Sequence, residues 1–70
     1  MPMTRIDPET APAHVRLLLR LEDGDVAATL ARAREGYQQL LAAGVTNPGR
    51  EMLRQKYERA IATLEELLAR

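Results

Sequence analysis

A helix stop and a helix start lie within six residues of each other in the middle of this chain, at Gly44–Gly49. Gly44 suits the left-handed backbone that closes many helices, and Asn47 followed by Pro48 is typical of an N-cap and a first helical residue. This pair of signals limits the fold more than any other feature, because the segments on its two sides must turn back on each other. The sequence therefore predicts an α-hairpin.

Both arms of the predicted hairpin carry apolar residues at alternating spacings of 4 and 3. This spacing predicts helices over residues 25–43 and 48–69, packed antiparallel at about 20°. Counting outward from the turn places Tyr37 opposite Leu53, and Leu30 opposite Ala60 or Ile61. The predicted seam residues are Val26, Leu30, Ala33, Leu40, Leu53, Ala60, Leu64 and Leu67.

A shorter helix is predicted before the hairpin, over residues 11–22, with Thr10 as its cap. Its stretch from Val15 to Leu21 is apolar around most of the helix circumference. A helix with more than one apolar face has to be covered on more than one side. We therefore expect it to pack on the hairpin and also to face a partner. With three predicted helices and no predicted strand, the expected fold class is all-α.

The junctions around this first helix complete the domain organisation. Gly24 in the acidic stretch 22–25 breaks the helix, and Asp23 or Asp25 can cap the next one. Residues 1–10 contain Pro2 and Pro8 and show no apolar periodicity. We expect a flexible lead-in over residues 1–10 and a single helical domain over residues 11–70.

The size of the chain points to a need for a partner. A 70-residue chain buries only about 60% of the surface that its unfolded form exposes. Cys, Phe and Trp are absent, so no disulfide supports the fold, and the core consists mainly of Leu, Ala, Val and Ile. A second copy or another protein is the expected source of additional stability.

Ten basic and ten acidic residues cancel, which disfavours nucleic acid as a partner. A DNA-binding helix-turn-helix is disfavoured for the same reason, since basic and acidic residues are interleaved in the last predicted helix. No apolar run is long enough to span a bilayer or to form a secretory signal. We expect a cytoplasmic protein that does not contact a membrane.

Catalytic chemistry is disfavoured by the residue types that are missing. The chain has no Ser and no Cys, which are the two commonest nucleophiles. His14 is the only histidine and lacks carboxylates at metal-ligand spacing, and Asp23 and Asp25 lack the remaining ligands of a calcium loop. We predict no enzymatic activity, no cofactor and no metal.

Candidate partner-binding residues come from the surplus apolar face of the first helix and from the two tyrosines. Tyrosines on a seam either bury their rings in the core with the hydroxyl at the rim, or form an aromatic patch for a partner, and both interpretations stay open. The candidates are Val15, Leu18, Leu19, Tyr37 and Tyr57.

A family resemblance rests on two parts of the sequence. They are the end of the second predicted helix, residues 38–44 (QQLLAAG), and five residues of the last predicted helix, Leu53, Gln55, Ala60, Ile61 and Leu64. In these features the chain resembles the YscE-type co-chaperones of the type III secretion needle subunit. The resemblance covers roughly residues 21–68, while the linker at 45–48 departs from the family pattern. It implies a cytoplasmic protein that pairs with a tetratricopeptide-like chaperone and keeps the needle subunit monomeric before export.

Two other functions remain open from the sequence. The heptad seams are also typical of a homo-oligomeric structural subunit, such as a phage or secretion component. The acidic turn at residues 22–25 before a helix, with Tyr57 in the next, also suits a helical-hairpin adaptor of microtubule-interacting-and-trafficking-like or tetratricopeptide-like type. All three functions depend on contact with another helical protein or with a second copy.

Overall fold

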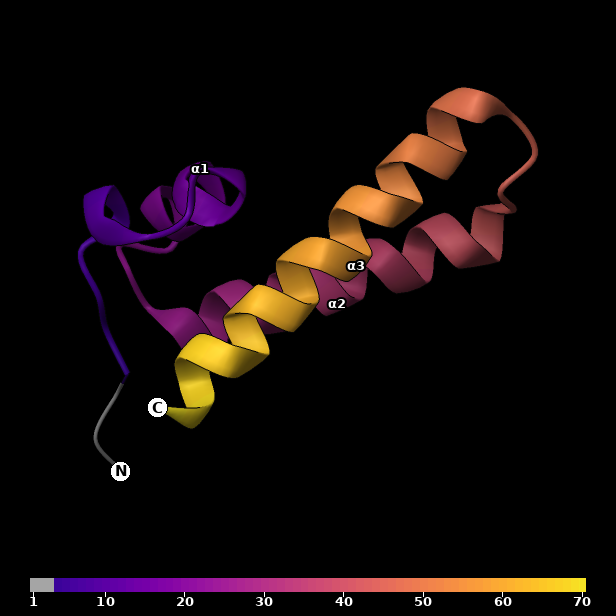
Figure 1. The fold of residues 1–70 in the computed structure, drawn as a ribbon. Helices are drawn as coiled ribbons and strands as arrows, with labels where there is room; N and C mark the ends of the chain where they lie inside the picture. The colour runs from indigo at the N-terminus through magenta and orange to yellow at the C-terminus, as the bar shows by residue number, and fades with distance from the viewer. Residues whose placement is uncertain (1–3) are drawn as a thin grey trace.

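The computed structural model describes residues 4–70 as an all-α fold in which a short helix packs on an α-hairpin (Figure 1). Its elements are the 3-10 turn η1 (Pro8–Thr10) and the helices α1 (Ala13–Leu21), α2 (Val26–Ala43) and α3 (Pro48–Ala69). The two arms α2 and α3 run antiparallel, and α1 lies over the open end of the hairpin, away from the turn. The tip of the hairpin extends beyond α1, and the molecule measures 39 × 23 × 19 Å.

The turn between α2 and α3 has the predicted stop and start. Gly44 has a φ of 92°, and its N–H donates to the Leu40 carbonyl at 3.1 Å. The Asn47 side chain caps α3, since its Oδ1 accepts from the backbone N–H of Arg50 at 2.9 Å. Asp25 is the N-cap of α2, accepting from the Ala28 N–H at 3.1 Å. Both helices of the hairpin therefore have the predicted ends to within one residue.

The hairpin core lies along the predicted seam, and its main apolar cluster is in the open half. Six of the eight seam residues are buried, whereas Leu53 is 43% exposed and Leu67 is partly buried against the core. The largest fully buried side chains are those of Leu19 and Leu64, which join α1 and α3 in one apolar cluster. The buried seam residues are Val26, Leu30, Ala33, Leu40, Ala60 and Leu64.

The two arms pair about one helical turn away from the predicted alignment. Tyr37 lies beside Tyr57, with ring centroids 6.3 Å apart, and its hydroxyl donates to Glu58 at 2.7 Å. The prediction of Tyr37 opposite Leu53 is therefore wrong. The first turn of α3 closes the hairpin tip, where the Arg50 guanidinium donates to the Gly44 carbonyl at 2.9 Å. Pairing with α2 begins only after this turn, which leaves Leu53 largely outside the seam.

Helix α1 is a core element on one face and exposed on the other. Val15 and Leu19 have no exposed surface, so they do not form the partner-binding face that the sequence predicted. Leu17 and Leu21 are 66% and 62% exposed instead, and Leu18 is partly buried between the two environments. Apolar residues cover most of the circumference of α1, apart from the side with Arg16 and Arg20, so the sequence did not separate the exposed leucines from the buried ones, and packing made that choice.

The segment before α1 is hydrogen-bonded to the turn between α1 and α2. The Ile6 N–H donates to the Gly24 carbonyl at 3.0 Å, and the Val26 N–H donates to the Thr4 carbonyl at 2.9 Å. Gly24 has a φ of 80°, and a Cβ there would lie 2.3 Å from the Ile6 carbonyl oxygen. Glycine is therefore required at this turn both for its conformation and for the close approach of residue 6.

This segment differs from the predicted flexible lead-in. Residues 4–10 form backbone hydrogen bonds and the η1 turn, while residues 1–3 lie outside the described part of the chain. Thr10 does not cap α1, because its hydroxyl donates to the Asp7 carbonyl at 2.8 Å and the chain continues through Pro12 before the helix begins. The packed domain thus includes residues 4–10.

Candidate partner-binding groove

The face of the hairpin on which α1 lies continues past α1 toward the tip and forms a groove with it. Two adjoining hollows, of about 420 and 230 Å³, make up this groove and share Leu18 and Tyr57. We call it the distal groove. Its apolar and small lining residues are Leu18 and Leu21 of α1, Ala33 and Gly36 of α2, and Leu53, Tyr57 and Ala60 of α3.

Gly36 and Tyr57 form the floor of the distal groove. A Cβ at Gly36 would lie 2.6 Å from the Tyr57 hydroxyl oxygen and 2.9 Å from the Cζ of its ring, so a residue with a Cβ here would displace the tyrosine ring. A glycine inside a helix costs about 1 kcal/mol relative to alanine. Within residues 4–70 the Tyr57 hydroxyl makes no hydrogen bond, and it remains available to a ligand.

Tyr37 has a different role from Tyr57, although both lie near the seam. Its hydroxyl donates to Glu58, which also accepts from Arg54 at 2.6 Å. The hydrogen bond to Glu58 raises the pKa of Tyr37, with partial burial as the second cause. Arg54 in turn pairs with Glu51. This network ties the two arms together, and Tyr37 does not belong to the lining of the distal groove.

The five predicted partner-binding residues therefore divide among three environments. Leu18 and Tyr57 line the distal groove, and Tyr37 belongs to the polar network between the arms. Val15 and Leu19 are on the buried side of α1, in the apolar core.

Sequence reasoning did not select Gly36, Leu21 or Leu53 as groove residues. Gly36 had a recognisable signal, because a glycine in the interior of an otherwise strong helix usually has a packing or functional reason. Leu53 had none, since an apolar residue on a helical seam normally predicts burial. Leu21 belongs to the apolar stretch 15–21, but only the packing of α1 shows that it is exposed.

A basic edge borders the distal groove on α3. Lys56 lines one of its hollows, and Lys56, Arg59 and His14 together line a further hollow beside it. The His14 ring is 2.7 Å from the Thr63 hydroxyl and so links α1 to α3 by a hydrogen bond. Burial lowers the pKa of His14, and the charge of Arg59 lowers it further. The electrostatic environment at this edge is therefore positive.

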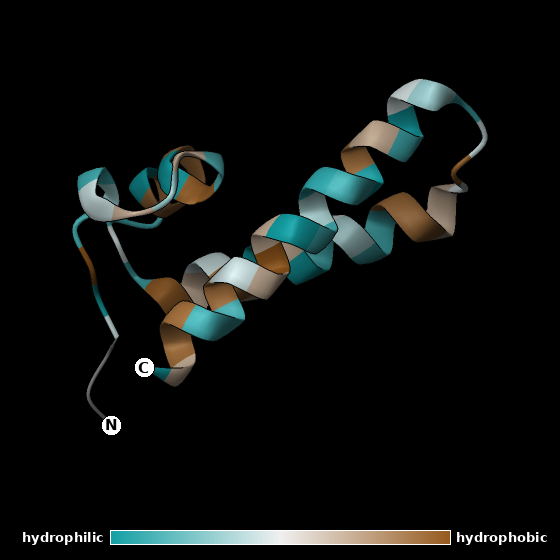
Figure 2. Cartoon of the chain, viewed as in Figure 1, coloured by the Kyte–Doolittle hydropathy of each residue, from teal (hydrophilic) through white to brown (hydrophobic). Residues whose placement is uncertain are grey.

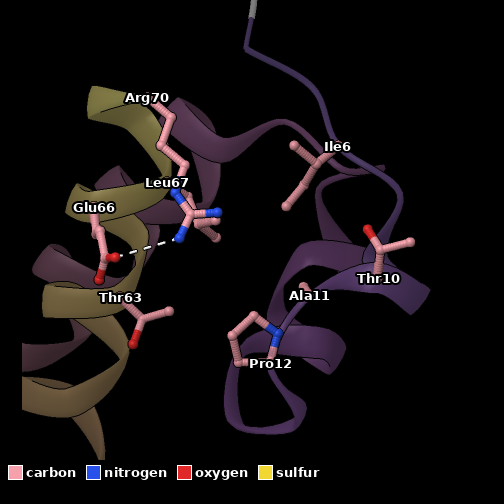
Figure 3. Close-up of a pocket in the computed structure, with 8 residues that line it drawn as sticks. All are labelled: Ile6, Thr10, Ala11, Pro12, Thr63, Glu66, Leu67 and Arg70. Atoms are coloured by element: carbon pink, nitrogen blue, oxygen red, sulfur yellow. Dashed lines mark hydrogen bonds and ion pairs between the residues drawn. The ribbon is translucent and has the colours of Figure 1, made fainter.

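A separate hollow, of about 600 Å³, lies where the segment before α1 passes the end of α3 (Figure 3), and we call it the terminal hollow. Its two charged side chains, Glu66 and Arg70, pair with each other at 3.3 Å, as the dashed line shows. The Thr63 hydroxyl is engaged by His14, and the Thr10 hydroxyl by the Asp7 carbonyl. Every polar side chain that lines this hollow thus has a partner among residues 4–70.

The hairpin tip carries apolar residues beyond the part that α1 covers (Figure 2). Leu41 and Met52 are 46% and 61% exposed there, in addition to Leu53. Of these three side chains, only that of Leu53 lines the distal groove.

Within the described residues, no three His, Cys, Asp or Glu side chains are placed to hold a metal ion, and the predictions of no metal and no cofactor stay predictions. No helix of the described chain has the length and apolar character needed to cross a membrane.

Comparison of this chain with family models, with curated proteins and with solved structures produced no match. The distal groove therefore has to be interpreted from its own chemistry.

Proposed function

We propose that this chain is a small non-catalytic subunit that binds a helical segment of a partner protein in the distal groove. The observation that supports this most directly is the open apolar groove itself, with Leu18, Leu53 and Tyr57 along it. Tyrosine and leucine side chains on a rigid helical scaffold are typical anchors of helix-in-groove recognition. The chain has no Ser and no Cys, and among residues 4–70 no group of His, Asp or Glu side chains is placed to hold a metal ion.

The more specific proposal is a cytoplasmic co-chaperone of a type III secretion needle subunit, acting with a tetratricopeptide-like chaperone. It is supported by the resemblance to the YscE-type family, whose members consist of a short N-terminal helix followed by a hairpin, like α1, α2 and α3 here. Such a subunit gains stability from its partner, because a ligand that binds only the folded chain shifts the folding equilibrium toward it.

The test is affinity capture of the tagged chain from its native host, with two matched variants. Leu53 and Leu41 are 43% and 46% exposed, and both lie near the hairpin tip, but only Leu53 lines the distal groove. We expect the native chain and Leu41→Asp to recover the same helical chaperone and needle subunit, and Leu53→Asp to lose both. Circular dichroism should show equal helicity in all three chains.

Three results would contradict this function. Recovery of the same partner by Leu53→Asp would exclude the distal groove as its site. Recovery of the tagged chain alone, with a concentration-dependent oligomer in sedimentation, would favour the homo-oligomeric structural subunit. Recovery of a partner unrelated to secretion would remove the co-chaperone role and leave a helical adaptor.

A further inference from the structure

Two positive charges beside the distal groove have no counter-charge among residues 4–70. The chain is neutral overall, and ion pairs join most of its arginines to carboxylates. Lys56 and Arg59 make no ion pair and no hydrogen bond within residues 4–70. Both lie on α3 at the edge of the distal groove, one helical turn from Tyr57 or closer.

The opposite edge of the groove has a different charge. Arg32 on α2 is paired with Glu22 at 2.6 Å, and Glu35, which also lines the α2 side, is exposed and makes no ion pair within the described chain. The groove is thus positive along α3 and neutral to negative along α2. An occupant with one charged flank is oriented by this difference, because the reverse orientation brings like charges together.

The shape of the groove suits a helix. Its floor consists of Ala33 and Ala60, which are buried in the hairpin core, and of the Tyr57 ring, which lies against Gly36. The same face already holds a helix at the open end of the hairpin, where α1 seats Val15 and Leu19. The face from Ala33 to the end of α2 spans roughly 15 Å at about 1.5 Å per residue, enough for about three turns of a second helix.

We infer that the occupant of the distal groove is an amphipathic α-helix of a partner protein, with an apolar stripe against Leu18, Leu53 and Tyr57 and acidic side chains over Lys56 and Arg59. This inference rests on the proposed function and specifies the chemistry of the partner. The acidic flank supplies the counter-charges that Lys56 and Arg59 lack within residues 4–70, and the apolar stripe covers the exposed Leu53. Two exposed ion pairs of this kind change affinity by about tenfold, and the effect weakens at high salt.

The test is selection from a displayed library of helical peptides about 16 residues long. Each peptide has leucines fixed on one face at the 3-and-4 spacing, and both flanks are randomised among Glu, Lys and Gln. We expect the full-length chain to enrich peptides with Glu along one flank. Fluorescence anisotropy of a selected peptide should show about tenfold weaker binding to the double variant Lys56→Glu with Arg59→Glu, and recovery with a peptide whose Glu residues are replaced by Lys.

A matched control changes the same charge at the other end of α3. Arg70→Glu replaces an arginine that is 69% exposed and lines the terminal hollow rather than the distal groove. It should leave the affinity of the selected peptide unchanged. Leu53→Asp should abolish binding, which places the peptide in the groove rather than on the basic edge alone.

The outcomes separate this inference from the proposed function. Peptides that need Leu53 but show no preference for Glu would overturn the acidic flank and leave a helix-binding groove. Failure to enrich any peptide would overturn the helical occupant, while the capture experiment with Leu53→Asp decides independently whether the groove binds a partner at all. A dimer of the chain that Leu53→Asp dissociates would assign the groove to a second copy and overturn the inference.

Discussion

The burial of Leu19 between α1 and the hairpin leads to a quantitative prediction, because an exposed leucine in the same helix serves as a matched control. Leu19 has no exposed surface, whereas Leu17 in the same helix is 66% exposed. Replacing either with alanine removes the same atoms and leaves the helix propensity nearly unchanged. Any difference between Leu19→Ala and Leu17→Ala therefore reports the packing of α1 on the hairpin.

The expected difference is large compared with the stability of the domain. Leu-to-Ala replacements at buried sites cost about 2–5 kcal/mol, since the transfer free energy of the lost atoms adds to that of the cavity. An exposed replacement stays within about 0.5 kcal/mol. At about 0.05–0.15 kcal/mol per residue, a chain of this length has a stability of roughly 4–10 kcal/mol. Leu19→Ala should thus remove a substantial part of the total.

The assay is urea and thermal unfolding of the full chain, followed by circular dichroism at 222 nm. For a domain of this size, 1 kcal/mol corresponds to a shift of about 4–8 °C in Tm. Leu19→Ala should lower Tm by about 10 °C or more, and Leu17→Ala should shift it by a few degrees at most. The dependence of the unfolding free energy on urea should be the same for all three chains, because α1 and the hairpin unfold together.

Two results would refute this reasoning. Equal stability of the two variants would mean that α1 does not pack through Leu19. An unchanged unfolding transition with a loss of helical signal equivalent to α1 alone would mean that α1 detaches without the hairpin. Either result would return Leu19 to the set of residues that are free to bind a partner.

Three further predictions concern single contacts. Gly36→Ala should stabilise the Tyr57→Ala variant by about 0.5–1 kcal/mol but give no gain, or a loss, in the native chain, where the added methyl meets the tyrosine ring; equal effects in both backgrounds would contradict the contact. Asn47→Ala should cost about 0.5–2 kcal/mol through loss of the α3 cap in urea unfolding, and an effect below that range would show that the hairpin turn does not depend on the cap. The lowered pKa of His14 means that the unfolded chain takes up this proton first as pH falls, so stability is complete above about pH 6.5 and declines below it; His14→Gln should show a smaller decline between pH 7.5 and 5.5 than the native chain, and identical profiles would contradict the shift.

Local signals in the sequence were sufficient for the helices of the hairpin. Gly44, Asn47 and Asp25 act through their own backbone or a neighbouring N–H, so their roles do not depend on distant parts of the chain. The heptad spacing likewise identified most of the residues that the open half of the hairpin buries. The sequence was less informative about α1, because apolar residues around most of the helix did not show which leucines are buried.

The candidate groove was predicted only in part. Leu18 and Tyr57 were expected to meet a partner, and both line the groove. The remaining groove residues depend on the alignment of α3 along α2. The 3-and-4 spacing of apolar residues does not determine this alignment, because a shift of one helical turn preserves most apolar pairings. Leu53 is exposed for this reason.

The amino-acid sequence by itself determined that this chain forms an α-hairpin preceded by a short helix, because caps, breaks and apolar periodicity act over a few residues. Only the tertiary structure decided the alignment of the arms, the buried face of α1 and the pairing of residues 4–6 with the turn at Gly24. Each of these depends on the fit of particular side chains across the molecule, as with Tyr57 against Gly36. The distal groove arises from that fit, since it is the part of the hairpin face that α1 leaves uncovered.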